Sequence, residues 1–224
     1  MHFACVITVD IRRSKEIKNR AEVQSRILNI LNSLNMKFGT FLIADFTMTL
    51  GDEFQGVLRT TSIVLDVFKY IKKNLPVKFY CGVGIGSIET PLSKRPSEMD
   101  GSAFHRSRDA LEEAKKRKIE LVFKSGNERI DFILNSITEL ILHVKNKWTK
   151  RQRDIISFLE SRENVRLSDA AKKFRVSKQA ISKIVRAAGW KAVRNTEKVV
   201  EYILKSLEKG KPYMVYNVKT TIGG

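Results

Sequence analysis

The sequence predicts an α+β protein built from two parts. In the first part, apolar strand-like runs alternate with segments of helical periodicity, whereas residues after about 126 show helical patterns. The chain has 224 residues, of which 42% are hydrophobic, so it is long enough to bury a core and to form one large or two small domains.

The first predicted strand is HFACVITVD, a nearly continuous apolar run that ends at Asp10. This pattern is typical of a central strand that is buried on both faces. Residues 14–38 follow and place apolar side chains at helical spacing. Two short strands come next, at 41–50 and 54–59, and Gly-Asp-Glu joins them as a hairpin turn.

A second helix is predicted from Thr61 or Ser62, either of which can cap it, to the residue before Pro76. Residues 77–89 form a glycine-rich strand, and the glycines indicate that another backbone or a ligand passes close to it. A loop, a helix at 102–117 and a strand at 119–125 complete the first part. The order βαββαβ describes a ferredoxin-like sheet with helices on one face, so we predict one domain over residues 1–125.

The second part is predicted to be helical. Residues 126–147 form a helix that links the domains, residues 148–210 contain short helical units, and residues 211–224 are a tail. In LSDAAKKFRVSKQAISKIVRAAGW, the small Ala170 and Ala171 let a second helix cross closely, and Ser177 caps that helix. This pattern predicts a helix-turn-helix domain with SKQAISKIVR as its recognition helix, and it resembles the helix-turn-helix of sigma-factor region 4.

The outward face of that helix carries hydrogen-bond donors suited to DNA phosphates and base edges. They are Ser177, Lys178, Gln179, Ser182, Lys183 and Arg186. Residues 148–210 hold 16 Lys or Arg and 7 Asp or Glu, and the whole chain has a net charge of +18. The charge favours an anionic partner such as nucleic acid. The alternative is a packed helical module with a solvated basic surface.

Two acids stand at predicted strand ends. Asp10 ends the first strand, and Asp52 lies at the hairpin tip between the second and third strands. In a ferredoxin-like sheet the two ends are neighbours, so we expect the carboxylates to lie close together. Close carboxylates repel unless a cation lies between them, and Mg²⁺ or Mn²⁺ prefers such oxygen ligands. Alternatively, each acid is an ordinary cap or turn residue.

The segments VDIRRS and TLGDEF resemble the two metal-binding segments of class III nucleotidyl cyclases and of GGDEF diguanylate cyclases. The resemblance implies that Asp10, the carbonyl of Ile11 and Asp52 hold metal ions on a nucleoside triphosphate, and that Glu53 matches the acid of the GDEF tetrad. Phosphate contacts are expected from the neighbouring loop and turn, because glycine allows close approach and backbone N–H groups face a helix start. These residues are Arg12, Arg13, Ser14 and Gly51.

The helix at 102–117 departs from the cyclase pattern. Active cyclases carry an Asn and, four residues later, an Arg at this place, whereas this chain has His105 and Asp109. The candidates for catalysis are therefore Glu53, His105 and Arg108. The resemblance implies a degenerate cyclase-like domain.

The whole arrangement looks most like the SatD family. We expect a cytoplasmic protein, because no apolar run approaches the roughly 18 residues of a membrane span and residues 1–10 lack a signal-peptide pattern. Cys5 and Cys81 are expected to be buried free thiols. Three hypotheses follow: a homodimeric DNA-binding regulator that senses a nucleotide, a metal-dependent enzyme acting on a purine nucleoside triphosphate, and a dimerisation scaffold without a ligand.

Overall fold

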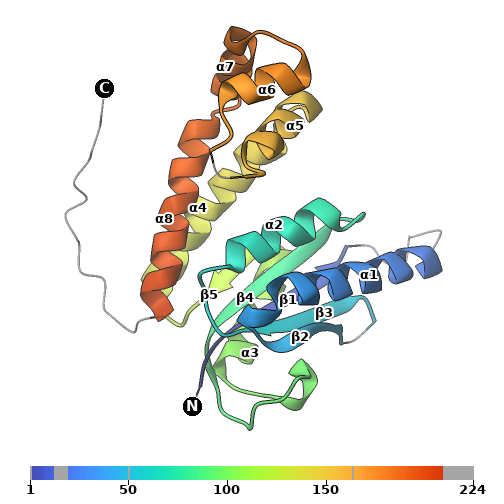
Figure 1. Cartoon of the computed structure of the whole chain (residues 1–224). Coiled ribbons are helices and arrows are strands. Elements are labelled where there is room, and N and C mark those ends of the chain that lie inside the picture. The colour runs from blue at the N-terminus through green and yellow to red at the C-terminus, as the bar shows by residue number, and fades with distance from the viewer. Residues whose placement is uncertain (1, 13–19, 50, 163, 209–224) are drawn as a thin grey trace.

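A five-stranded mixed sheet forms the centre of the first part of the protein (Figure 1). The computed structural model describes residues 2–12, 20–49, 51–162 and 164–208. The sheet order is β2-β3-β1-β4-β5, in which β1 pairs antiparallel with β3 and β4, and β5 lies parallel to β4. The strands are β1 (His2–Ile11), β2 (Leu42–Met48), β3 (Glu53–Leu58), β4 (Phe79–Ile88) and β5 (Leu121–Lys124). The first four have the predicted ferredoxin-like order.

Eight α-helices complete the described part of the chain, which confirms the α+β class. In the first part they are α1 (Arg20–Phe38), α2 (Val64–Asn74) and α3 (Ser102–Arg117). In the second part they are α4 (Glu128–Asn146), α5 (Lys150–Leu159), α6 (Leu167–Phe174), α7 (Lys178–Ala187) and α8 (Trp190–Glu208). The predicted start of the first helix, residues 14–19, lies outside the described residues.

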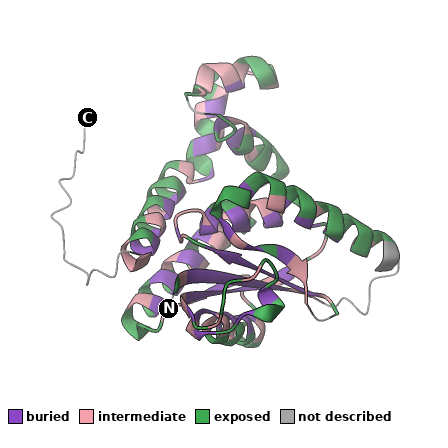
Figure 2. Cartoon of the chain, turned by 60° about the horizontal axis from the view of Figure 1, so that its bottom comes forward, coloured by how far each residue is buried: buried purple, intermediate pink, exposed green. Residues whose placement is uncertain are grey.

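The two faces of the sheet are covered by different helices. Alternate residues of β1, Cys5, Ile7 and Val9, belong to the large core that also contains residues of α1 and α2. The intervening Ala4 and Val6 pack with Ala103 of α3 on the opposite face. Thus α1 and α2 share one face, as predicted, and α3 covers the other. Figure 2 shows the strands buried between these layers.

The glycines of β4 allow α3 to lie directly on the sheet. A Cβ built at Gly82 would overlap the carbonyl oxygen of Ser107, and one at Gly84 would overlap the carbonyl oxygen of Ala103. The predicted close approach of another backbone is therefore confirmed, and that backbone belongs to α3.

At each edge of the sheet, an asparagine side chain from a helix bonds to the backbone of one strand residue. Asn35 of α1 accepts from the amide of Phe46 in β2 and donates to its carbonyl, at 2.8 and 3.0 Å. Asn135 of α4 makes the same two hydrogen bonds to Phe123 in β5, at 2.8 and 2.9 Å. Each amide takes the place of a neighbouring strand at an edge that would otherwise have unpaired backbone groups.

The helices α4 and α8 pack against each other, and α5 to α7 lie at one end of this pair (Figure 1). At that end, Trp148 Nε1 donates to the carbonyl of Ala188 at 2.7 Å. The other end of α8 contacts the first part of the protein, because Thr61 Oγ1 donates to the carbonyl of Leu204 at 2.6 Å. The predicted segments 126–147 and 148–210 therefore contribute helices that pack together, and one apolar core extends from Cys5 to Leu204.

Three smaller findings concern individual predictions. Thr61, predicted as a possible cap of α2, bonds to α8 instead, and the N-cap position of α2 is held by Ile63, which makes no side-chain capping hydrogen bond. Cys5 and Cys81 are buried free thiols, as predicted, and burial raises the pKa of both.

Among the described residues, no helix combines the length and apolar character needed to cross a bilayer.

Candidate functional site

The two segments singled out in the sequence meet at one end of the sheet. The amide of Ile11 donates to the carbonyl of Asp52 at 3.2 Å, and Asp10 of β1 lies directly opposite Glu53 of β3. Residues directly opposite each other in an antiparallel pair project to the same face. The carboxylates of Asp10 and Glu53 therefore both lie on the face that α3 covers. Asp52 lies in the turn before β3, where strand alternation does not fix its direction.

Two cations of α3 neutralise these two acids. Lys115 Nζ lies 3.2 Å from Asp10 Oδ2, and Arg108 Nη1 lies 2.9 Å from Glu53 Oε2. Glu53 is also held by Thr49, whose Oγ1 donates to Oε1 at 3.1 Å. The predicted candidates Glu53 and Arg108 thus form an ion pair. Lys115 is not among the predicted site residues, although its position two helical turns after Arg108 places it on the same helix face.

The ammonium group of Lys115 is shared between two carboxylates. A second carboxylate oxygen, Oε1 of Glu112, lies 3.2 Å from Nζ. Partial burial lowers the pKa of Lys115, but the charges and hydrogen bonds of Asp10 and Glu112 raise it by more, so its pKa lies above the ordinary lysine value. Lys115 is therefore protonated throughout the neutral range.

A buried polar layer fixes α3 against the strands beside the ion pairs. Gln55 of β3 donates from Nε2 to Thr8 Oγ1 at 2.8 Å, and the Thr8 hydroxyl contacts the hydroxyl of Ser107 on α3. All three side chains are buried. Their hydrogen bonds satisfy one another, which removes most of the cost of burying them and sets the position of α3 along β1.

The predicted phosphate-binding residues are only partly described. The Arg12 guanidinium lies over the ring of Tyr80, 4.4 Å from its centroid, at the same end of the sheet. Gly51 has φ of 58°, a left-handed conformation that favours glycine in this turn. No atom apart from those of its chain neighbours lies within 4 Å of a Cβ built there, so the space beside the turn is open. Arg13 and Ser14 lie outside the described residues.

Two other polar side chains of α3, those of the candidate His105 and of Arg106 next to it, have other partners. His105 Nε2 lies 3.4 Å from Asp100 Oδ1, in the loop before α3. Arg106 Nη1 donates to the carbonyl of Ile85 at 2.7 Å and so supports the packing of α3 on β4. Of the three candidates for catalysis, the structure brings Glu53 and Arg108 together, and His105 has a separate contact.

The oxygen atoms at these strand ends are of the kind that a hard divalent ion prefers. Within the described residues, no three or more His, Cys, Asp and Glu side chains are grouped so as to hold a metal ion by themselves. Asp10, the Ile11 carbonyl and Asp52 nevertheless supply only oxygen donors at adjacent strand ends. Mg²⁺ commonly binds one or two such carboxylates and completes its coordination with water and phosphate oxygens.

The predicted DNA-contacting residues lie on α7. Ser177 precedes the helix, and its hydroxyl accepts from the amide of Ala180 at 3.1 Å, as predicted for a cap. Ile181 and Val185 are buried beneath the helix. The outward positions are polar: Ser177, Lys178, Gln179, Lys183 and Arg186 are exposed, and Ser182 is half-buried.

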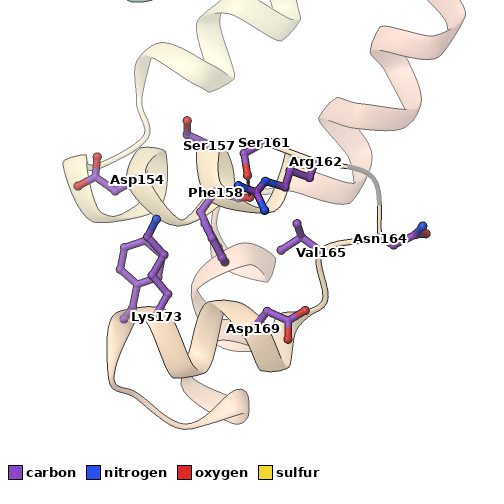
Figure 3. Close-up of a pocket in the computed structure, with 10 residues that line it drawn as sticks. Asp154, Ser157, Phe158, Ser161, Arg162, Asn164, Val165, Asp169 and Lys173 are labelled. Atoms are coloured by element: carbon purple, nitrogen blue, oxygen red, sulfur yellow. Dashed lines mark hydrogen bonds between the residues drawn. The ribbon is translucent and has the colours of Figure 1, made fainter.

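A groove of about 780 Å³ lies on α5 and α6 (Figure 3). The rings of Phe158 and Phe174 meet edge to face in it, with centroids 6.0 Å apart, and Lys173 Nζ lies 4.4 Å from the centroid of Phe158. None of the predicted DNA-contacting residues lines this groove. It is therefore a feature separate from the outward face of α7.

These features define an α+β protein in which a ferredoxin-like sheet is joined to a pair of packed helices, α4 and α8, that carries three shorter helices. The sequence pattern of the SatD family matches residues 4–204. The chain therefore belongs to the SatD family, which confirms the resemblance found in the sequence.

Several solved structures are similar to part of the chain. A bacterial light-regulated adenylyl cyclase is 14% identical, with a TM-score of 0.40 over 55% of this chain and 75% of that chain. The guanylate cyclase domain of RhGC from Catenaria anguillulae in complex with GTP is 18% identical, with a TM-score of 0.33 over 49% of this chain and 72% of that chain. No curated protein matches the sequence.

Proposed function

We propose that this protein is a DNA-binding regulator in which α6 and α7 form a helix-turn-helix and α7 contacts the DNA. The observation that carries the proposal is the outward face of α7. The helix is capped by Ser177 and buries Ile181 and Val185, while donor side chains project from it into solvent. A helix of this kind can enter a major groove and present its donors to phosphates and base edges.

The surrounding charge supports the proposal. The 16 Lys or Arg and 7 Asp or Glu of residues 148–210 make this region strongly basic. Such an excess attracts DNA through its phosphates and releases bound counterions, so the affinity should fall steeply with salt. Two copies of the chain would present two such helices to a palindromic site, and we expect a homodimer on DNA.

The test is a fluorescence-anisotropy titration of the full chain with genomic DNA fragments at about 50–100 mM salt, where phosphate contacts are strongest. A variant with Lys178, Lys183 and Arg186 all changed to Ala should bind at least tenfold more weakly, with a shallower dependence on salt. A matched control changes three exposed lysines of the first part, Lys73, Lys94 and Lys116, to Ala and should keep most of the affinity. Equal losses in both variants, or no binding by the wild type, would overturn the proposal.

A second candidate function is favoured by the end of the sheet at β1 and β3. We propose that this site binds a purine nucleoside triphosphate with Mg²⁺ or Mn²⁺, either as a sensed ligand or as a substrate. Asp10, the Ile11 carbonyl and Asp52 would hold the ion, which neutralises phosphate charge when bound. The guanidinium of Arg108 is half-exposed while its partner Glu53 is buried, so Glu53 positions it toward an incoming phosphate.

Two measurements test this second function. Calorimetric titration with ATP and GTP in the presence of Mg²⁺ should detect binding that Asp52→Asn weakens. Chromatography of the same mixtures after incubation distinguishes an enzyme from a sensor, because an enzyme converts the triphosphate and a sensor leaves it intact. If neither ATP nor GTP binds, the site is neither a nucleotide sensor nor an enzyme acting on these nucleotides.

A further inference from the structure

We propose that Lys115 is a built-in competitor of the divalent ion for Asp10. In the absence of the ion its ammonium group neutralises the Asp10 carboxylate, and it must move away before the ion can bind. The inference rests on the second proposed function, because it concerns the metal ion of that site. Lys115 would thus set the affinity of the site for the divalent ion without being a ligand of that ion.

The first support is the state of the Asp10 carboxylate. Its Oδ2 atom already has a cation at 3.2 Å, the ammonium of Lys115. An ion at the same oxygen would meet that positive charge at close range, and like charges at such a distance disfavour each other. Repulsion between Asp10 and Asp52 is one reason to expect a metal ion at this site, and a protein side chain already neutralises Asp10.

The second support is that this ion pair can open at low cost. The side chains of Lys115 and Asp10 are 32% and 28% exposed, and ion pairs that water reaches contribute only about 0–1 kcal/mol. The other pair is different, because Glu53 is 7% exposed and is also bonded to Thr49. Arg108 is therefore the fixed cation of the site and Lys115 is the exchangeable one.

The third support is that Lys115 has a second partner. Glu112 Oε1 lies 3.2 Å from its Nζ and one helical turn earlier on α3. The ammonium group can leave Asp10 and keep Glu112, so the exchange needs a side-chain movement and no displacement of the helix. The helix itself is held by the glycines of β4 and by the contact of Ser107 with Thr8.

The test is a titration of the nucleotide-free full chain with Mn²⁺, followed by electron paramagnetic resonance, in which bound and free Mn²⁺ differ. Lys115→Met should bind Mn²⁺ more tightly than the wild type, by up to about fivefold, since the competing charge is gone. Lys116→Met, which removes an exposed charge next in the sequence, should leave the affinity unchanged. Asp10→Asn combined with Lys115→Met should lose the gain, which places the ion at Asp10. Thermal unfolding of each variant confirms that it is folded.

The outcomes distinguish a failure of the proposed competition by Lys115 from a failure of the proposed metal site. Mn²⁺ binding by the wild type with no gain in Lys115→Met overturns the inference and leaves the metal site standing. An equal gain in Lys116→Met also overturns it, because the effect would then be one of overall charge. No Mn²⁺ binding by any variant overturns the inference together with the metal part of the proposed function.

Discussion

At the scale of single residues, Gly84 shows how the sequence places α3 over the site. This glycine lies in the middle of β4, and a side chain there would overlap the backbone of Ala103 and Ser107. The same helix carries Arg108 and Lys115, which neutralise Glu53 and Asp10. The close packing on glycine thus determines which cations reach the acids.

We expect Gly84→Ala to destabilise the protein by about 1–3 kcal/mol, because α3 must shift to make room for the methyl group. The measurement is urea unfolding followed by circular dichroism. Gly39→Ala is the control, since no atom lies within 4 Å of a Cβ built at that position. Equal stabilities of the two variants would contradict the packing described for α3.

Some contacts of the candidate site can be predicted from the sequence, and others depend on how distant segments pack. The adjacency of the Asp10 and Asp52 segments follows from strand order, which the pattern of elements predicts. The pairing of Lys115 with Asp10 depends on where α3 sits along β1, and the hydroxyl contact of Thr8 with Ser107 sets that position across 99 residues of sequence. No local pattern contains this information.

At the scale of elements, the strand β5 depends on α4 for its outer edge. Asn135 is buried and binds both backbone groups of Phe123 that face away from the sheet. The helix thereby closes an edge that could otherwise pair with another chain. This explains why the helix predicted as a link between domains packs against the sheet.

Replacing Asn135 with Leu should destabilise the protein by about 2–4 kcal/mol, because it leaves one buried N–H and one buried C=O without partners. Because it weakens the contact of α4 with β5, it should also raise the tendency to aggregate through the edge of β5 when α4 detaches. Urea unfolding and light scattering measure the two effects. Ser136→Ala, at the next and exposed position of α4, should change neither. A variant as stable as the wild type would show that the edge does not need this cap.

Elements with strong periodicity were predicted well, and those defined by distant contacts were not. The strands and the helices α1 to α4 follow from apolar spacing and from turn residues. The sequence does not predict the length of α8. It also does not predict the hydrogen bond from Thr61 to the carbonyl of Leu204 in α8, because a threonine just before a helix is usually its cap. Its true partner is 143 residues away.

At the scale of the whole molecule, α8 contacts both parts of the chain. The buried carboxylate of Glu197 lies 3.2 Å from Lys69 of α2 and 2.9 Å from Lys145 of α4. The end of the same helix bonds to Thr60 and Thr61 through Glu208. The three shorter helices are therefore carried by a pair of helices that is anchored on the sheet domain.

We expect a single unfolding transition in urea, with circular dichroism and tryptophan fluorescence giving the same midpoint, since both Trp148 and Trp190 lie in the second part. Glu197→Ala should lower that midpoint in both signals and reduce the free energy of unfolding by about 1–3 kcal/mol, because it leaves two lysines without their shared carboxylate. Glu201→Ala removes the same charge from α8 and serves as the control. Two separate transitions would show that the two parts fold independently.

Hydrogen–deuterium exchange of the full chain, with and without a bound DNA fragment, tests the proposal that α7 contacts DNA. If α7 contacts DNA, protection on binding centres on residues 177–186, with little change in the strands β1 to β5. Protection confined to the sheet or to α1 and α2, with α7 unchanged, would contradict it, as would a chain that binds no DNA at low salt.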